Sequence, residues 1–213
     1  MHIAPPSREE RRDVLVQAIS DIQFAALVVT ANGGIEASHL PMLVRERSDG
    51  RLTLEGHVSR ANTLWRLSSA TAALAIFQGP QAYIHPGWYP TKRRDGRAVP
   101  TWNYIAIHVH GVVSAIEDQD WLNRHLETLT KRNEEHRREP WLISDAPEEF
   151  IGGLVKGIVG LQVEVERIEG NWKMAQKQPL ENRLGAAHGL AASERAADRE
   201  VGSLIAAAAL NIR

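Results

Sequence analysis

The sequence predicts an α+β fold built on a mostly antiparallel β-barrel, with helices at its edges. Short β-rich runs separated by hairpin-length turns fill residues 24–116, and one further strand pattern follows much later. Segments that alternate strand and helix, as parallel βαβ units require, are few. No G-x-G-x-x-G motif follows a strand pattern, so a dinucleotide-binding fold has no support.

Size and composition suit one domain with appendages. The chain has 213 residues, 43% of them hydrophobic, and a formal net charge of −1. It therefore lacks the overall basic excess of a dedicated DNA-binding domain. It has no cysteine, which excludes disulfides, thiolate metal sites and cysteine nucleophiles. No membrane span or signal peptide is recognised, so we expect a cytoplasmic protein.

The first part of the chain is predicted to form one helix and a strand meander. Ser7 and Glu10 have the spacing of a capping box, and an apolar stripe follows them, so a helix is expected over residues 7–21. Turn sequences such as "ANGG" and "RSDGR" separate the β-rich runs after it. The strands expected here cover residues 24–30, 35–46 and 52–58.

The remaining elements are predicted by the same patterns. A short helix is expected over 61–70, then a hairpin of strands 72–79 and 82–87 turning at Gly79-Pro80. A polar loop leads to Ala98. The later elements are a strand over 101–116, helices over 118–137 and 147–157, a strand over 158–170 and a helical tail over 179–213.

The stretch "VPTWNYIAIHVHG" (Val99–Gly111) predicts a two-sided strand, because alternate residues of a strand share a face. The apolar face carries Ile105, Ile107, Val109 and Val113. The other face carries Trp102, Tyr104, His108 and His110. The second face suits either an interface, with a second copy or with the following helix, or ligand contact, and the pattern favours neither. Two histidines alone are a weak basis for a metal site, and no metal ligand is predicted.

The segments "SHLP" (38–41) and "GHVSRAN" (56–62) suggest an anion site. A helix expected to begin near Asn62 would offer free N–H groups, and Arg60 would add a permanent cation. His39 and His57 would join them if their strands pair. The alternative is an ordinary strand-to-helix corner with an exposed arginine.

The third candidate is "GPQAYIHPGWYPTKRRDGR" (79–97). Tyr83, Trp88 and Tyr89 could stack on a flat ring, and Lys92 could reach a phosphate. The alternative is that this segment is a basic surface loop. No nucleophile triad is recognised and the paired carboxylates fall on expected helix surfaces, so no catalytic residue is predicted.

Several motifs together resemble the PaiB family of FMN-binding negative transcriptional regulators. They occur in the family's order and cover nearly the whole chain: "SHLP", "GHVSRAN", "FQGPQAYIHPGWY", "VPTWNY" and "IVGLQVEVERIEGNWKMAQ". The resemblance implies an FMN-binding split β-barrel of the pyridoxamine-phosphate-oxidase type. It further implies a homodimer with flavin sites at the subunit interface. Residues 1–178 would form the split-barrel domain and residues 179–213 a helical extension.

Carried over residue by residue, the resemblance implies a set of FMN-binding residues. They are Ser38, His39, Leu40, His57, Arg60, Asn62, Trp88, Tyr89, Lys92, Thr101, Trp102, Asn103, Lys173 and Gln176. The sequence departs from the family pattern at His85 and Gly87, and it has "KMAQKQ" where the family has "K-L-S-Q-N-R".

The function implied is that of an FMN-binding transcriptional regulator acting as a homodimer. A flavin-dependent oxidoreductase and a non-catalytic flavin- or haem-binding module are the alternatives. No helix-turn-helix pattern stands out, so the sequence does not support direct DNA binding, and regulation would work through a protein partner or through DNA contacts that the sequence does not reveal.

Overall fold

The computed structural model describes residues 1–31, 33–66 and 71–210, which fall into two compact units. Unit 1 comprises Met1–Ala18, Gln78–His108 and Glu169–Arg213, and unit 2 comprises Ile19–Phe77 and Val109–Ile168. Three long strands, β6, β7 and β8, contribute residues to both units.

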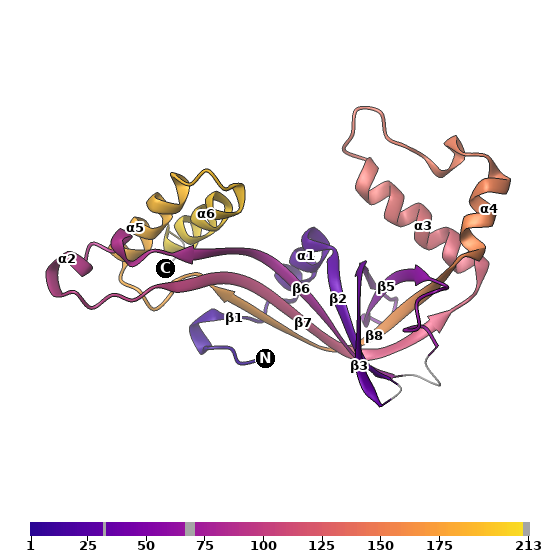
Figure 1. The fold of residues 1–213 in the computed structure, drawn as a ribbon, viewed down its shortest axis with the longest axis horizontal. Coiled ribbons are helices and arrows are strands. Elements are labelled where there is room, and N and C mark those ends of the chain that lie inside the picture. The colour runs from indigo at the N-terminus through magenta and orange to yellow at the C-terminus, as the bar shows by residue number, and fades with distance from the viewer. Residues whose placement is uncertain (32, 67–70, 211–213) are drawn as a thin grey trace. The chain divides into compact units, whose positions relative to one another are not determined.

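Figure 1 shows the elements along the chain. The strands are β1 (Arg8–Glu9), β2 (Phe24–Ala31), β3 (Gly34–Pro41), β4 (Leu43–Glu46), β5 (Leu52–Ser59), β6 (Thr71–Ile84), β7 (Thr101–Ile116) and β8 (Ile158–Lys173). The α-helices are α1 (Arg12–Ile22), α2 (Lys92–Asp95), α3 (Gln119–Glu134), α4 (Glu148–Lys156), α5 (Leu180–Ala191) and α6 (Ala196–Leu210). Short 3-10 helices cover Pro5–Ser7, Pro86–Trp88 and Ile143–Asp145.

The sheet is antiparallel wherever the strand register is given, as the sequence predicts. Its strand order is β3-β2-β6-β7-β8-β5-β4, with β1 pairing with β8. Within unit 2, β2 lies between β3 and β6, and β5 lies between β4 and β8. The pairing of β5 with β8 sets His57 opposite Gly160. Trp121 of α3 packs on this glycine, so this part of β5 lies near α3.

The two faces of β7 are confirmed. Ile105, Ile107, Val109 and Val113 are buried. The polar and aromatic residues between them are half-buried or exposed, with Trp102 exposed to 48%. The period-two pattern therefore identified the core face of this strand correctly.

Unit 1 has its own hydrophobic core, in which helices α5 and α6 cover the ends of the long strands. Its buried members are Ala82, Ile84, Tyr89, Ile105, Met174, Ala186, Ala187, Leu190, Val201 and Ile205. In Figure 1, α5 and α6 lie against one another beside these strand ends. The alanine-rich tail thus contributes core residues, because small side chains let two helices approach closely.

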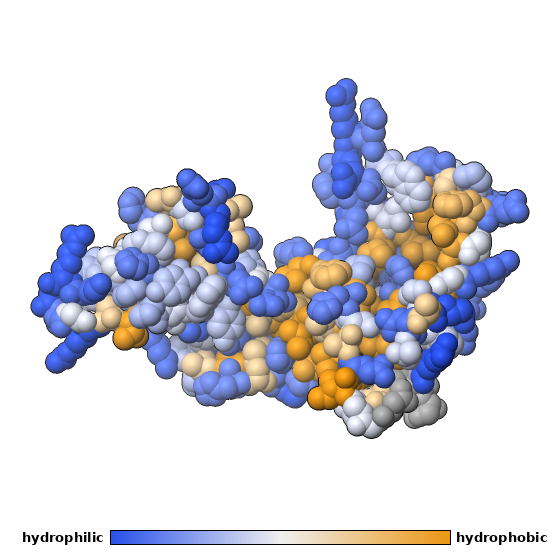
Figure 2. Space-filling view, viewed as in Figure 1, coloured by the Kyte–Doolittle hydropathy of each residue, from blue (hydrophilic) through white to orange (hydrophobic). Residues whose placement is uncertain are grey.

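Unit 2 carries apolar surface at α4 as well as a buried core. Figure 2 shows apolar side chains gathered near this helix. The large hydrophobic residues that α4 exposes are Phe150 and Leu154. Exposed apolar surface of this kind is common on proteins that associate.

The expected hairpin over 72–87 is wrong. Residues Thr71–Ile84 form a single strand, β6. Gly79 does not adopt the positive φ that a tight hairpin turn requires, since the described glycines with positive φ are Gly33, Gly50 and Gly96. Gly79-Pro80 therefore lies within the strand, and proline is tolerated where its missing N–H is not needed.

Three other boundaries differ from expectation. No helix forms over 61–66, where the chain makes turns, and residues 67–70 lie outside the described residues. The first helix begins at Arg12 and not at residue 7, because Ser7 ends a 3-10 helix and its hydroxyl donates to Gln176 Oε1 at 3.4 Å instead of forming a capping box with Glu10. The strand expected over 35–46 is interrupted at Met42, which is buried.

Candidate functional site

A cavity of about 470 Å³ in unit 2 gathers most of the residues expected to bind a phosphate. The ends of β3 and β5 supply His39, Leu40 and His57, and the following turn supplies Ser59 and Asn62. The last turn of α4 closes the cavity from the opposite side. No acidic side chain lines it, so its polar lining is compatible with an anion.

Asn62 ties the two sides of this cavity together. Its amide Nδ2 donates to Ser38 Oγ at 2.8 Å, and its Oδ1 accepts the backbone N–H of Leu64 at 2.8 Å. Ser59 Oγ likewise accepts the N–H of Ala61 at 3.2 Å. These backbone donors are already used, and with no helix over 61–66 the helix N-terminus expected here is absent. Side-chain donors must bind any anion in the cavity.

Arg60 lies next to the cavity but is not among its lining residues. Its guanidinium pairs with Glu117 at 2.6 Å and donates to the carbonyls of Lys156 and Ile158. The carbonyl of Lys156 belongs to the last residue of α4, where a cation is favourable to the helix dipole. The guanidinium also lies over the Trp65 ring at 5.4 Å.

The half-buried His57, which lines this cavity, pairs with the buried His125. His57 Nδ1 and His125 Nε2 are 3.1 Å apart, and Trp121 stacks on His125 with ring centroids 5.2 Å apart. Burial lowers the pKa of His57. Burial, followed by the charges of His57 and Arg45, lowers the pKa of His125 to about 4. Both rings are therefore neutral near pH 7.

A second cavity, of about 450 Å³, lies within unit 1 and contains five other expected residues. They are Tyr89, Thr101, Asn103, Lys173 and Gln176. Asn103 is exposed to only 1%, and its Nδ2 has no hydrogen-bond partner among the described residues. The same holds for the buried Tyr89 hydroxyl and for Asn171 Oδ1. Buried polar atoms normally find partners, so this cavity is fitted for a polar ligand.

The remaining polar groups of this cavity are held in place. Lys173 Nζ donates to Thr101 Oγ1 at 2.9 Å and lies 5.8 Å from the centre of the Tyr104 ring. Gln176 Oε1 accepts the backbone N–H of Met174 at 2.8 Å, and its Nε2 donates to the Trp172 carbonyl. Burial raises the pKa of Tyr89, so its hydroxyl remains protonated and able to donate.

Five expected residues line neither cavity: Ser38 and Arg60, whose contacts are given above, and Trp88, Lys92 and Trp102. Trp88 packs against α5, where added Cβ atoms at Gly185 and Gly189 would come within 2.2 and 2.3 Å of it. Lys92 is exposed on the four-residue helix α2. Trp102 makes an edge contact with Tyr83, with ring centroids 6.1 Å apart. The structure gives Trp88 a packing role and leaves Lys92 and Trp102 on the surface.

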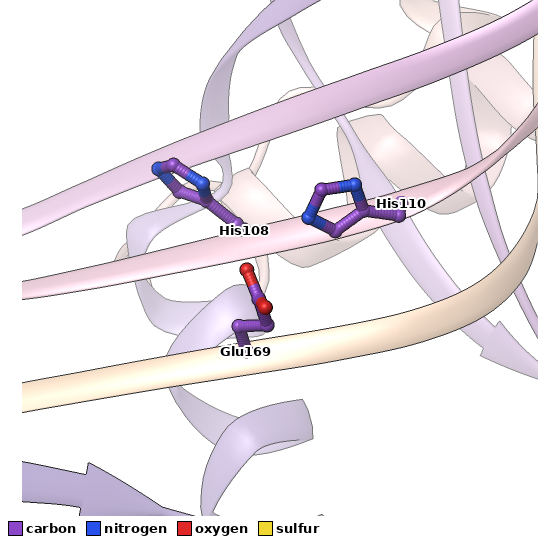
Figure 3. Close-up of side chains that lie close together, drawn as sticks. All are labelled: His108, His110 and Glu169. Atoms are coloured by element: carbon purple, nitrogen blue, oxygen red, sulfur yellow. The ribbon is translucent and has the colours of Figure 1, made fainter. Parts of the chain in front are cut away.

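The two histidines of β7 project as expected. Figure 3 shows His108 and His110 on this strand, with Glu169 of β8 nearby. Candidate ligand atoms of His108 and Glu169, both in unit 1, lie within 4.8 Å of each other. Glu169 Oε2 also accepts the N-terminal ammonium at 2.7 Å. A metal cation would have to displace that ion pair, and we assign no metal role here.

Comparison with known proteins shows which family the chain belongs to. The family described as "Putative FMN-binding domain" matches residues 1–167. The chain belongs to this FMN-binding domain family. Its relatives include the Bacillus subtilis (strain 168) "Protease synthase and sporulation protein PAI 2", which is 34% identical over 75% of this chain and 74% of the relative. An uncharacterised protein of Emericella nidulans is 28% identical over 89% of this chain and 90% of its own.

Solved structures show how this FMN-binding domain chain folds. The FAD and heme binding protein from Mycobacterium smegmatis matches with a TM-score of 0.55 and 14% identity, over 78% of this chain and 73% of that one. The flavocytochrome Anf3 from Azotobacter vinelandii matches with a TM-score of 0.52 and 13% identity, over 80% and 72%. At such identities the likeness concerns the fold alone. It confirms the predicted α+β split barrel.

Two residues were not predicted from the sequence, one that lines the unit 1 cavity and one that contacts a lining residue of the unit 2 cavity. Asn171 lies in a predicted strand and was given no site role. Asparagine is uncommon in strands, so its presence there was a usable signal. In the structure its Nδ2 donates to the Tyr104 hydroxyl. His125 lies in α3, and no sequence pattern assigned it a site role. Its partner, His57, is 68 residues away in sequence.

None of the described helices is long and apolar enough to cross a membrane.

Proposed function

We propose that this FMN-binding domain chain binds FMN, and that it acts as a homodimeric transcriptional regulator of the PaiB type. The observation that carries the cofactor assignment is the unit 1 cavity with its buried, unpartnered polar atoms. The pyrimidine edge of a flavin offers carbonyl acceptors and a ring N–H donor. Asn103 Nδ2 can donate to such a carbonyl and Asn171 Oδ1 can accept from the N–H, so the residues fit the group.

The unit 2 cavity, taken by itself, suits a phosphate group. His39, His57, Ser59 and Asn62 are hydrogen-bonding side chains, and no carboxylate lines the cavity to repel a dianion. Arg60 lies beside it, in an ion pair that two partly exposed side chains form. Such a surface pair contributes only about 0–1 kcal/mol. Arg60 can therefore exchange Glu117 for a phosphate at small cost.

Bound FMN would supply electron-transfer chemistry, and the protein residues would bind and orient it. The regulatory part of the proposal is supported by the PaiB-like motifs and by the relative named for protease synthesis and sporulation. The net charge of −1 favours regulation through a protein partner over direct DNA binding.

The cofactor proposal is tested by titrating the purified chain with FMN and following flavin absorption and fluorescence. Asn103→Leu removes the unpaired donor while keeping the side-chain volume. We expect it to weaken FMN binding about tenfold, which corresponds to one lost hydrogen bond in a buried site. Asn133→Leu, at an exposed asparagine on α3, is the control and should bind as wild type. Absence of any flavin binding, or equal effects of both variants, would reject this site.

A further inference from the structure

His57 and His125 must share one proton between them. Their facing nitrogens, His57 Nδ1 and His125 Nε2, are 3.1 Å apart, and the rings meet edge to face. Of two neutral imidazoles in this arrangement, one donates and the other accepts. His57 itself lines the unit 2 cavity. The direction of that hydrogen bond decides whether Nε2, the other ring nitrogen of His57, carries a proton or a lone pair.

The surroundings keep both rings neutral. Burial is the first cause that lowers the pKa of each ring, and the neighbouring charges of His57 and Arg45 lower that of His125 further. Glu55 is buried close to Arg45 and pairs with it at 2.6 Å. Its carboxylate is therefore committed to a guanidinium and does not stabilise an imidazolium.

The buried side of His125 sets the direction of the hydrogen bond. His125 Nδ1 is buried and has no partner among the described residues. A proton on this nitrogen would be an unpaired buried donor, which is rarer and more costly than an unpaired acceptor. The proton of His125 therefore belongs on Nε2, from which it donates to His57 Nδ1. His57 must then carry its own proton on Nε2.

The packing around His125 holds its ring in this orientation. The Trp121 ring lies nearly parallel to the imidazole, at an angle of 10°. Gly160 of β8 leaves the space that Trp121 occupies, because an added Cβ would come within 2.3 Å of the indole. His57 is paired with the same glycine across β5 and β8.

We propose that His125 is a positioning residue that fixes the tautomer of His57, so that His57 presents an Nε2–H donor to a phosphate group in the unit 2 cavity. The opposite tautomer would turn a lone pair toward the phosphate oxygens, which also carry lone pairs and negative charge. The phosphate assignment rests on the proposed FMN function. The tautomer assignment concerns the protein alone and can be tested without a cofactor.

The first test is the nitrogen-15 NMR spectrum of the histidine side chains at pH 7.5. Long-range proton–nitrogen correlations distinguish a protonated ring nitrogen from an unprotonated one. In the wild-type protein we expect His57 to be protonated on Nε2 and unprotonated on Nδ1. In His125→Phe, which keeps an aromatic ring on Trp121 but removes the donor, His57 should become a mixture of tautomers. His125→Gln restores an N–H donor and should restore the Nε2–H form.

The second test measures binding of inorganic phosphate and of FMN to the same variants, with His136→Phe, at an exposed histidine, as control. His125→Phe should weaken both ligands about three- to tenfold, while His125→Gln and the control stay near wild type. A proton on His57 Nδ1 in the wild type overturns the proposal. So does a His125→Phe protein with an unchanged tautomer or an unchanged phosphate affinity. If the tautomer and phosphate results hold but FMN does not bind, the proposed function fails and this inference stands.

Discussion

Asn62 illustrates how a single side chain can serve both the fold and the site. Its Oδ1 holds the backbone N–H of Leu64 and its Nδ2 reaches Ser38 on the neighbouring strand. An amide carries two N–H groups and two lone pairs on its oxygen, so each end keeps spare capacity for a ligand. The motif "GHVSRAN" therefore shapes the wall of the cavity as well as lining it.

Arg60 is the residue whose role most needs a direct measurement. We expect Arg60→Ala to weaken FMN binding about ten- to hundredfold, because one charge-assisted hydrogen bond to phosphate contributes about 1.5–3 kcal/mol. Riboflavin, which lacks the phosphate, should bind almost unchanged. Parallel fluorescence titrations of wild type and variant with both flavins check this. Equal weakening of both flavins would assign Arg60 to capping α4 and to its ion pair with Glu117 instead.

His125 should make the stability of the protein depend on pH. Its pKa is about 4 in the folded protein against 6.5 for the free side chain. Between these values the unfolded chain binds a proton that the folded protein does not, so the free energy of unfolding falls as the pH falls from about 6.5 to 4. The full loss is about 3 kcal/mol. Urea unfolding at several pH values measures it, and His125→Phe should show a smaller loss. A variant that follows the wild-type pH profile would contradict this origin.

At the scale of elements, α5 is fixed to unit 1 by glycines that allow close approach to Trp88. A Cβ at Gly185 would lie 2.2 Å from the Trp88 carbonyl oxygen, and one at Gly189 would lie 2.3 Å from the indole. Small residues at a helix surface permit such contacts, since any larger side chain forces the helix outward. The family motif residue Trp88 thus anchors the tail helix, which the motif comparison alone did not indicate.

We expect Gly185→Ala to lower the free energy of unfolding by about 1–3 kcal/mol, because the new methyl group meets a backbone atom that cannot rotate away. Gly152→Ala in α4 is the matched comparison. Its Cβ would meet nothing within 4 Å, so the better helix propensity of alanine should stabilise the protein by up to about 1 kcal/mol. Thermal or urea unfolding of both variants measures whether each change lowers or raises the free energy of unfolding. A neutral Gly185→Ala would show that the helix can shift freely.

Elements with a regular pattern over many residues were predicted well, and those defined by local exceptions were not. Strand β7 was predicted over residues 101–116 and found there, because the alternation continues without a break from Trp102 to Val113. The hairpin at Gly79-Pro80 failed because a turn sequence can also fit inside a long strand when neighbouring strands continue the pairing. The helix predicted over 61–66 likewise does not form, because the side chains of Ser59 and Asn62 accept hydrogen bonds from nearby backbone N–H groups and stabilise turns instead.

At the scale of the whole molecule, the candidate site residues fall into two groups, one in each unit. The sequence indicated most members of both groups through the family motifs. It could not indicate that Asn103 and Asn171, which are far apart in the chain, line one cavity with unpaired polar atoms. Nor could it pair His57 with His125. Such facts depend on tertiary contacts, which no local pattern encodes.

The protein should be a homodimer. Light scattering at micromolar concentration should give twice the 23.7 kDa of one chain. The motivation is the aromatic face of β7, where Trp102 is 48% exposed and contacts the similarly exposed Tyr83. Aromatic residues in this setting are enriched at interfaces, and placing a charge among them on association is costly.

Trp102→Glu should therefore shift the mass toward that of a monomer and raise the dissociation constant at least tenfold. Trp141→Glu is the control. Trp141 is 44% exposed in unit 2, so the change adds the same charge and removes the same ring elsewhere on the surface. Circular dichroism should confirm that both variants stay folded. A wild-type monomer at these concentrations would reject the dimer, and equal dissociation by both variants would reject the face of β7 as its interface, since only a specific contact distinguishes two equally exposed tryptophans.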